Sequence, residues 1–365
     1  MMPSNPLLRP VTVNPSSESI ARAAECLLAG ELVGLPTETV YGLAARGDVE
    51  SAVDKIFAAK NRPRTNPLIL HVACTADAMS LFADDLSPVV RDRIKRLDPY
   101  WPGPLTLIGP RHHSILDYVT AGGDTVAVRV PDHPVALALL RQLATVAGKP
   151  IPIAAPSANP SNYVSPTTAS HVAEGLGAHV AMILDGGPCR VGLESTILFL
   201  GTETTPARVL RSGGISVEQL SETLGGPVLG PDPKPVSEHS HRDPSVVASP
   251  GQFAKHYSPR TPVILLAKPD SKEREFPCAD STAPPRLSRV LRIVFGPVEN
   301  AIPDGISDVW SFSPDGRLET AASELYATLR KADAGQFDLI EIVPCTESGL
   351  GVAIMDRLRR ASRQG

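Results

Sequence analysis

The chain has few cysteines and a small net charge, and each of these two features argues against a class of protein. Its five cysteines are scattered, odd in number and never paired as C-x-x-C, so neither a disulfide framework nor a structural zinc site is favoured. The formal net charge is only -4 at pH 7. Because the chain as a whole does not attract nucleic acid or anionic membranes, any phosphate must be bound by a local cluster of cations.

Long hydrophobic runs are also missing. The N-terminal stretch MMPSNPLLRP contains no apolar run that would serve as a signal peptide, and no segment approaches the roughly 20 apolar residues of a membrane span. We therefore expect a soluble cytoplasmic protein with no membrane partner. The chain has 365 residues, of which 42% are hydrophobic. Single cores stop growing at roughly 250 to 300 residues, so this length predicts two domains.

Helical and extended patterns alternate over the first 225 residues. Asn14 and Pro15 are typical of the start of a helix that Gly30 ends, and Asp48 is expected to cap a second helix. Further helices are predicted at 88–97 and 134–146. Apolar runs predict strands at 31–35, 67–73, 105–109, 125–130 and 151–155. The alternation indicates a mixed α/β domain.

The composition changes after residue 211. Ser216 to Gln219 fits a capping box for one last helix, and residues 225–262 are then crowded with Pro, Gly, Ser, His and Asp. A loop of that length is improbable inside one compact domain, so the segment either joins two domains or acts as a lid. We predict a first domain at 1–225, a linker or lid at 226–261 and a second domain at 262–365.

The second domain is predicted to be a smaller α/β unit. Its strands are expected at 263–267, 290–295 and 339–343, with a helix at 318–332 and a final helix ending near Arg360. The polar, proline-rich insert at 268–288 is expected to be a mobile loop.

Two motifs concentrate polar side chains around predicted strands. PTETVYGL at 36–43 supplies hydroxyls, and KNRPRTNPLILH at 60–71 supplies His71 together with Lys60 and Arg62, which are expected in a loop after a helix. Singly, such groups would more often form an ordinary turn, a solvated loop or a hydrogen-bonded core histidine. Together they lie at strand ends and adjoining loops, where open α/β sheets bind ligands. They predict a small anionic ligand with a second polar group.

Strand alternation brings further groups to the same region. In TVAVRVP, Thr125 and Arg129 point to one face, so a cation projects from an otherwise apolar strand. Burying that charge unpaired would be costly, so Arg129 needs an anionic partner, either an internal Asp or Glu or a ligand. In IPIAAPSAN, Ala155 and Ser157 share a face, and the following turn could present backbone N–H groups and the Ser157 hydroxyl to an anion.

The order of these motifs resembles a known family. PTETVYGL, K-x-R followed by NPLILH, TVAVRVP, APSAN, SPT and GLESTI are similar to the motifs of threonylcarbamoyl-AMP synthases with a YrdC-like domain, over residues 15–225. The later SPGQFAKHYSPRTP and GLGVAIMDRLRRAS resemble the longer, two-domain members. The resemblance implies a YrdC-like mixed twisted sheet with helices as the catalytic domain, followed by a smaller C-terminal Rossmann-like α/β domain.

The family implies a reaction. In it, L-threonine, bicarbonate and ATP give threonylcarbamoyl-AMP and pyrophosphate, and the product is the activated intermediate for threonylcarbamoyladenosine in tRNA. The chain would then be a nucleotidyltransferase that uses Mg²⁺ with its ATP and has no metal site of its own. Its product would pass to tRNA threonylcarbamoyl-transfer proteins, while direct binding of tRNA stays open.

The resemblance also implies roles for individual residues. The L-threonine site would be formed by Thr39, His71, Arg129, Ala155 and Ser195. The ATP site would be formed by Lys60, Arg62, Asn66, Thr125, Ser157, Ser165, Arg211 and the linker residue Tyr257. Lys60 and Arg62 would be the catalytic pair, because they could offset the charge that builds on the phosphoryl oxygens. Tyr257 would bring the linker back over the ligand as a lid that excludes water.

Two other classes of function remain open. A nucleic-acid-binding module could use the same surface for RNA, although the acidic net charge argues mildly against it. A carbamoyl-transferring relative of the hydrogenase-maturation type would share the YrdC-like domain. The absence of C-x-x-C pairs and the position of the extension, at the C-terminus, count against that second alternative.

Overall fold

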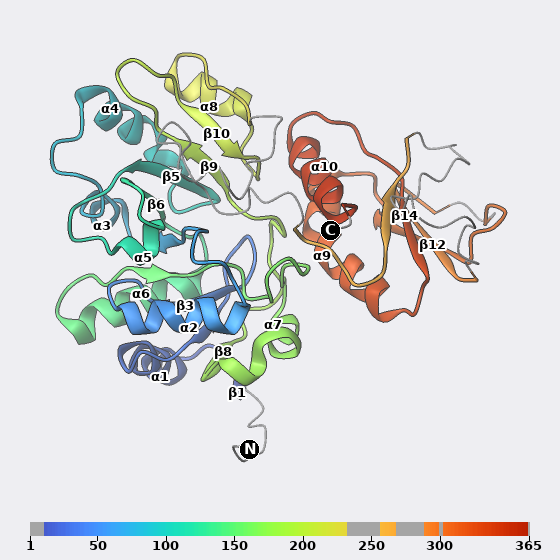
Figure 1. Ribbon diagram of the computed structural model, residues 1–365, viewed down its shortest axis with the longest axis horizontal. Helices are drawn as coiled ribbons and strands as arrows, with labels where there is room; N and C mark the ends of the chain where they lie inside the picture. The colour runs from blue at the N-terminus through green and yellow to red at the C-terminus, as the bar shows by residue number, and fades with distance from the viewer. Residues whose placement is uncertain (1–10, 232–255, 268–287, 299–301, 364–365) are drawn as a thin grey trace.

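The computed structural model describes residues 11–231, 256–267, 288–298 and 302–363. Within these ranges the chain forms two α/β units, a large one built on a ten-stranded sheet and a small one built on four strands (Figure 1). None of the described helices combines the length and apolarity that a membrane span requires. Most of the predicted linker and nearly all of the insert at 268–288 lie outside the described residues, so their predicted roles stay predictions.

The large unit contains the first ten strands of the chain. They are β1 (Val11–Val13), β2 (Val33–Leu35), β3 (Gly42–Arg46), β4 (Ile69–His71), β5 (Leu105–Pro110), β6 (Thr125–Arg129), β7 (Ile153–Ala154), β8 (Met182–Leu184), β9 (Thr196–Phe199) and β10 (Arg208–Arg211). Their order in the sheet is β1-β8-β2-β3-β7-β4-β6-β5-β9-β10. The sheet is mixed: β4 runs parallel to β6 but antiparallel to β7. This confirms the mixed twisted sheet expected from the sequence.

Helices cover both faces of the large sheet. On one face α1 (Ser17–Leu28) packs against α6 (Pro134–Ala147), and Leu27, Leu139 and Leu143 are fully buried there. Each such leucine contributes about 1.5–3 kcal/mol of burial free energy. The helices on the other face are α2 (Glu50–Lys60), α3 (Thr75–Met79), α4 (Pro88–Leu97), α5 (Asp117–Thr120), α7 (Ala169–Leu176) and α8 (Val217–Leu224), with short 3-10 turns at Asp98–Tyr100 and Gly177–His179.

Two predicted helix starts were wrong. Ser16, not Asn14, caps α1, because the Ser16 hydroxyl accepts the Ser19 N–H at 3.1 Å and the Ser19 side chain bonds back in a capping box. Asp48 does not cap α2, since its carboxylate is held by Arg46 at 2.8 Å. By contrast, the capping box predicted at Ser216 is present at the start of α8.

The small unit has an all-parallel sheet. Its strands are β11 (Val263–Leu265), β12 (Val290–Phe295), β13 (Asp308–Ser313) and β14 (Leu339–Ile342), ordered β11-β14-β12-β13. Two helices, α9 (Leu318–Ala334) and α10 (Leu350–Ala361), pack against each other. Their core continues into the large unit through Val40, Val164 and Leu193. The two units therefore share a packed interface.

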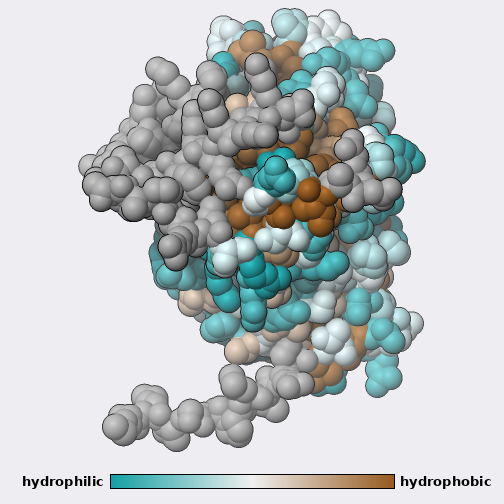
Figure 2. Space-filling view, turned by 90° about the vertical axis from the view of Figure 1, so that its right-hand side faces the viewer, coloured by the Kyte–Doolittle hydropathy of each residue, from teal (hydrophilic) through white to brown (hydrophobic). Residues whose placement is uncertain are grey.

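The outer surface of the small unit is mixed in polarity. Figure 2 looks onto this side of the molecule and shows apolar residues gathered near its middle, bordered by hydrophilic ones. The large apolar side chains of the small unit that are more than a third exposed include Val298, Ile302 and Val352. They are few, as is usual for the surface of a globular protein.

Candidate active site

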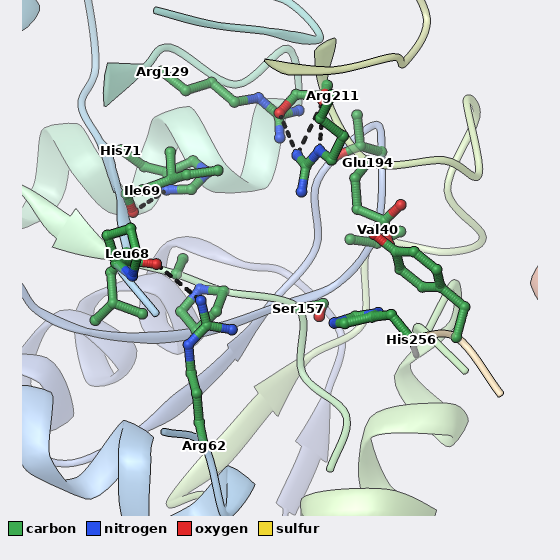
Figure 3. Close-up of a pocket in the computed structure, with 16 residues that line it drawn as sticks. Val40, Arg62, Leu68, Ile69, His71, Arg129, Ser157, Glu194, Arg211 and His256 are labelled. Atoms are coloured by element: carbon green, nitrogen blue, oxygen red, sulfur yellow. Dashed lines mark hydrogen bonds between the residues drawn. The ribbon is translucent and has the colours of Figure 1, made fainter. Parts of the chain in front are cut away.

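A pocket opens at the carboxyl ends of β4 and β6. These strands are parallel, with His71 in register with Arg129, so both side chains reach the same edge of the sheet. Sixteen residues line the pocket, whose empty space, including the open mouth, is about 520 Å³, a size suited to a small ligand (Figure 3). The predicted site residues among them are Thr39, Arg62, His71, Arg129, Ala155, Ser157, Ser195, Arg211 and Tyr257.

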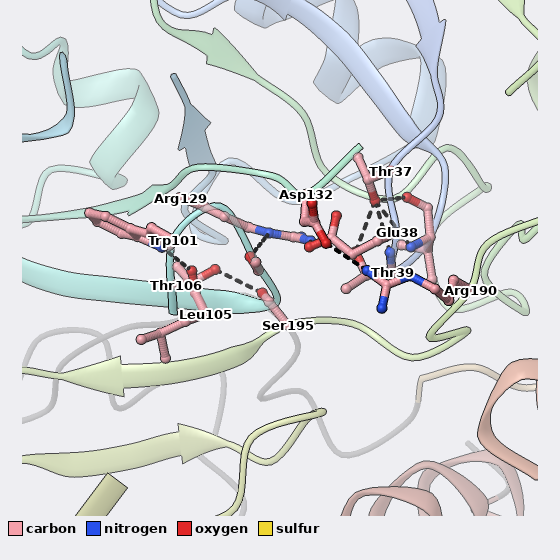
Figure 4. A network of polar contacts seen from close by, with 12 residues as sticks. Thr37, Glu38, Thr39, Trp101, Leu105, Thr106, Arg129, Asp132, Arg190 and Ser195 are labelled. Atoms are coloured by element: carbon pink, nitrogen blue, oxygen red, sulfur yellow. Dashed lines mark hydrogen bonds and ion pairs between the residues drawn. The ribbon is translucent and has the colours of Figure 1, made fainter. Parts of the chain in front are cut away.

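Arg129 is held by a buried ion pair. Its Nη2 lies 2.6 Å from Glu38 Oε1, and its Nε donates to the Gly103 carbonyl oxygen at 3.2 Å (Figure 4). The side chains of Arg129 and Glu38 are only 5% and 1% exposed. Of the two anionic partners that the sequence allows for Arg129, the internal carboxylate is therefore present. Arg129 also lines the pocket, where it can meet a ligand. Its Nη1 has no hydrogen bond within the described ranges, so the guanidinium can still donate hydrogen bonds to a ligand carboxylate.

Two further arginines face the pocket, and their hydrogen-bond partners within the part of the chain that the structure describes are all neutral oxygens. Arg62 donates to the backbone carbonyls of Asn66 and Pro67, and Arg211 donates to the carbonyl and hydroxyl oxygens of Ser195. In Figure 3 the side chains of Arg211 and Arg62 enter the cavity from opposite sides. Burial, followed by the charge of Arg211, lowers the pKa of Arg62 to about 9. Two buried cations that face one pocket favour a polyanionic ligand.

The two histidines of the pocket are neutral at physiological pH. Burial, followed by the charge of Arg129, lowers the pKa of His71 to about 3. Burial likewise lowers the pKa of His256 to about 3, although Glu194 opposes the shift. The Nδ1 atom of His71 lies 3.2 Å from the carbonyl oxygen of Ile69, which is hydrogen-bonding distance. Both rings are therefore uncharged; His71 contacts a backbone carbonyl oxygen, whereas the buried His256 Nδ1 has no hydrogen-bond partner among the described residues.

Lys60 lies outside the pocket lining. It is the last residue of α2, so the loop position predicted for it was wrong. Its side chain is buried, and its Nζ donates to the carbonyl oxygens of Ser157 and Asn159. Burial, followed by the charge of Arg62, lowers the pKa of Lys60 well below its usual value. Lys60 therefore holds the turn that presents Ser157 to the pocket.

Three more predicted site residues also lie outside the lining. Ser165 is buried and donates its hydroxyl to Glu194 Oε1 at 2.6 Å. Asn66 is buried, and its Oδ1 has no partner among the described residues. Thr125 is the first residue of β6 and comes four residues before Arg129. The two residues are therefore roughly 13 Å apart along the strand. The shared face of Thr125 and Arg129 therefore does not bring them to the same end of the strand.

Buried hydroxyls border the arginines. Ser195 is fully buried, and its Oγ lies 2.7 Å from Thr106 Oγ1 (Figure 4). The same Oγ accepts a hydrogen bond from Arg211 Nη2 at 3.0 Å. Thr39 is also fully buried, with its Oγ1 2.9 Å from that of Thr37. Such hydroxyls can rotate to donate or accept, which suits recognition of a small polar ligand.

Sequence reasoning missed two carboxylates. Glu38 belongs to PTETVYGL and Glu194 to GLESTI, but neither pattern shows which cation the carboxylate faces. Glu38 pairs with Arg129, 91 positions away, and Glu194 lines the pocket. The only signal was the expectation that Arg129 needs an internal or ligand anion. His256 was noticed only as the neighbour of Tyr257, and it also lines the pocket.

The pocket offers a metal ion no open carboxylate within the described residues. Glu194 is the one acidic residue of its lining, and both of its oxygens already accept hydrogen bonds. These donors do not fit a resident divalent cation, which prefers free oxygen ligands. Elsewhere, Asp84, His112 and His113 bring potential ligand atoms within 4.8 Å of one another at the surface.

Comparison with known proteins identifies the chain. Residues 25–213 match a family model described as "Telomere recombination", and residues 215–363 match one described as "Threonylcarbamoyl-AMP synthase, C-terminal domain". The threonylcarbamoyl-AMP synthase of Bacillus subtilis is 38% identical over 354 residues, which cover 94% of this chain and 92% of that protein. The chain belongs to the threonylcarbamoyl-AMP synthase family. It is therefore an enzyme of that family, as the motifs predicted.

Other members of the synthase family agree in sequence and in fold. The threonylcarbamoyl-AMP synthase of Pyrococcus abyssi is 36% identical over 346 residues, which cover 93% of each chain. A crystal structure of P. abyssi Sua5 complexed with L-threonine aligns with a TM-score of 0.76 at 31% identity, covering 96% of this chain and 97% of that one. The two-domain mixed α/β fold is confirmed, and neither alternative function is favoured.

Proposed function

We propose that the chain synthesises threonylcarbamoyl-AMP from L-threonine, bicarbonate and ATP, with release of pyrophosphate, for threonylcarbamoyladenosine modification of tRNA. The observation that carries this is the distribution of charge in the pocket. Arg129 is neutralised by Glu38, whereas the hydrogen-bond partners of Arg62 and Arg211 among the described residues are all neutral oxygens. A zwitterionic amino acid suits the neutralised Arg129, and a polyphosphate suits the space between Arg62 and Arg211. The reaction class is that of a nucleotidyltransferase.

The threonine half lies around Arg129. The free Nη1 of Arg129 would bind the threonine carboxylate, while Glu38 keeps the guanidinium in place. The buried hydroxyls of Thr39 and Ser195 are suited to the hydroxyl and amine of threonine, and the neutral His71 adds a hydrogen-bonding group without charge. Ala155 leaves room for the amino acid beside them. A site that hydrogen-bonds the threonine hydroxyl rejects analogues that lack it.

The ATP half lies between Arg62 and Arg211. These cations, with the Ser157 turn and Tyr257, would contact the nucleotide directly. Lys60 supports them by fixing that turn through its hydrogen bond to the Ser157 carbonyl oxygen. The remaining ATP assignments concern three residues outside the lining. Asn66 offers an Oδ1 that has no partner among the described residues, and Ser165 orients Glu194. Thr125 is kept only because the TVAVRVP motif resembles that of the family.

The chemistry relies on positioning and charge stabilisation. The threonine nitrogen bonds to the carbon of bicarbonate with loss of water, which gives a carbamate. A carbamate oxygen then attacks the α-phosphorus while the bond to pyrophosphate breaks. Arg62 and Arg211 would offset the charge on the phosphoryl oxygens, which is often the largest catalytic effect. Mg²⁺ would arrive with ATP and withdraw charge from its phosphates.

The linker residue Tyr257 supports the lid part of the proposal. It lines the pocket, is only 1% exposed and has a φ of 63°, a conformation that bulky residues rarely adopt. The segment containing His256 and Tyr257 thus returns to the nucleotide half, where it would exclude water from a labile carbamate. We place the enzyme in the cytoplasm, where tRNA threonylcarbamoyl-transfer proteins would take over its product.

The experiment that tests this function is pyrophosphate release from ATP with Mg²⁺, threonine and bicarbonate each omitted in turn. We expect release only when all are present, together with a product of the mass of threonylcarbamoyl-AMP. Release that ignores threonine would contradict the proposed reaction. Tight, salt-dependent RNA binding without threonine would instead support a nucleic-acid-binding module.

A further inference from the structure

A buried cluster joins the small unit to the wall of the pocket. Arg357 of α10 donates from Nε to Glu194 Oε2 at 3.0 Å, and Tyr326 of α9 donates its hydroxyl to the same oxygen at 2.9 Å. From the large unit, Ser165 bonds to Glu194 Oε1. The side chains of Arg357 and Glu194 are 1% and 7% exposed. We refer to Glu194, Ser165, Tyr326 and Arg357 as the Glu194 cluster.

Close packing holds this cluster against the pocket. Tyr257 stacks on Tyr326 with ring centroids 5.6 Å apart, and the Arg357 guanidinium lies 5.3 Å from the centre of the Tyr257 ring. Gly192, two residues before Glu194, has a φ of 74° and lets α9 approach closely. A Cβ at this position would lie 2.4 Å from the Ala322 carbonyl oxygen. The geometry of the cluster therefore depends on the C-terminal unit.

Two arginines, Arg357 and Arg211, stabilise the charged form of the Glu194 carboxyl. Burial alone would raise the pKa of the Glu194 carboxyl, but Arg357, then Arg211, and the hydrogen bond from Ser165 hold it at about 2. Arg357 and Tyr326 together occupy Oε2. Without them, Arg211 is a cation close to the carboxylate: it is hydrogen-bonded to Ser195, the residue that follows Glu194, and both Arg211 and Glu194 line the pocket. An ion pair between Glu194 and Arg211 would neutralise a charge that the phosphates need.

We propose that Arg357 and Tyr326 are positioning residues of the active site. They hold the Glu194 carboxylate to the C-terminal unit, and so leave the Arg211 guanidinium free for the phosphates of ATP. The inference rests on the proposed function and gives the C-terminal unit a role in ATP binding without any contact to ATP. It predicts an effect mainly on ATP, because the Arg129–Glu38 pair that would bind the threonine carboxylate makes no hydrogen bond with the Glu194 cluster among the described residues.

The test compares full-length variants by calorimetric titration with ATP and Mg²⁺, and by KM for ATP and for threonine in pyrophosphate release. We expect Arg357→Met to weaken ATP binding about tenfold and to leave the KM for threonine within about twofold. Tyr326→Phe, which keeps the ring stack, should act in the same direction with a smaller effect. Arg359→Gln on the same helix removes an exposed ion pair with Glu347 and should change neither quantity.

A second substitution separates positioning from folding. Adding Glu194→Gln to Arg357→Met should restore ATP affinity to within about threefold of the Glu194→Gln single variant, because no carboxylate is left to pair with Arg211. If Arg357→Met does not fold, Tyr326→Phe decides the question by itself. Unchanged ATP affinity in the folded variants, or a double variant that binds ATP no better than Arg357→Met, would overturn the proposal. Wild-type pyrophosphate release that ignores threonine would instead contradict the proposed function, and the calorimetric comparison would still stand.

Discussion

Replacing Arg129 should have two separable consequences, one for stability and one for threonine binding. Arg129→Met removes a guanidinium that is paired at 2.6 Å with Glu38, a residue only 1% exposed. Breaking a buried pair from one side leaves an uncompensated charge and costs about 3–5 kcal/mol of unfolding free energy. Losing a charged hydrogen bond to the ligand carboxylate should cost about 1.5–3 kcal/mol of binding, which is roughly 10- to 150-fold in affinity.

Glu38→Gln separates the two effects. In the double variant with Arg129→Met no buried carboxylate is left without its cation, so most of the lost stability should return. Threonine affinity should remain low, because the group that would bind the carboxylate is still missing. Urea unfolding measures the first quantity, and calorimetric titration with L-threonine measures the second.

An exposed arginine beside the same network provides the control. Arg190 pairs with Asp132 at 2.6 Å, but its side chain is 70% exposed (Figure 4). Arg190→Met should therefore cost under about 1 kcal/mol and leave threonine binding unchanged. Wild-type threonine affinity in the double variant would refute the role given to Arg129. A double variant as unstable as Arg129→Met would refute the explanation of its stability.

Three further predictions follow from other contacts. Folding lowers the pKa of His71 from 6.5 to about 3, so between these pH values only the unfolded chain binds this proton. The free energy of unfolding should therefore fall as the pH drops from about 6.5 towards 3. His71→Gln should reduce this pH dependence, which urea unfolding at several pH values measures. Lys60→Met should weaken ATP binding in calorimetry by freeing the Ser157 carbonyl, whereas Lys55→Met, which removes an exposed pair, should not. Gly192→Ala should cost about 1–3 kcal/mol more in thermal unfolding than Gly122→Ala, since both have positive φ but only Gly192 faces the backbone of α9; equal losses would contradict this packing role.

The parts of the site that follow local rules could be predicted from the sequence. Strand alternation placed a cation on β6, and the paired strands bring Arg129 to the same edge as His71. Lys60 was placed in a loop because helix ends are the least certain feature of a sequence pattern, and α2 runs to Lys60. The partners of Glu194 could not be found, because Tyr326 and Arg357 lie 132 and 163 positions away and only tertiary packing brings them together.

The three arginines of the pocket differ in how their charge is balanced, and this difference divides the site. Arg129 has its own buried carboxylate, so its end of the pocket is nearly neutral before a ligand binds. Arg62 and Arg211, which enter the pocket from opposite sides, have only carbonyl and hydroxyl partners among the described residues, so the space between them keeps its positive charge. Among the described residues, the carboxylate of the pocket lining that could cancel that charge is Glu194, and Arg357 and Tyr326 of the C-terminal unit hydrogen-bond to it. Electrostatics can therefore direct the carboxylate of an amino acid to Arg129 and the phosphates of a nucleotide to the space between Arg62 and Arg211, and the second domain maintains the difference on which this sorting depends.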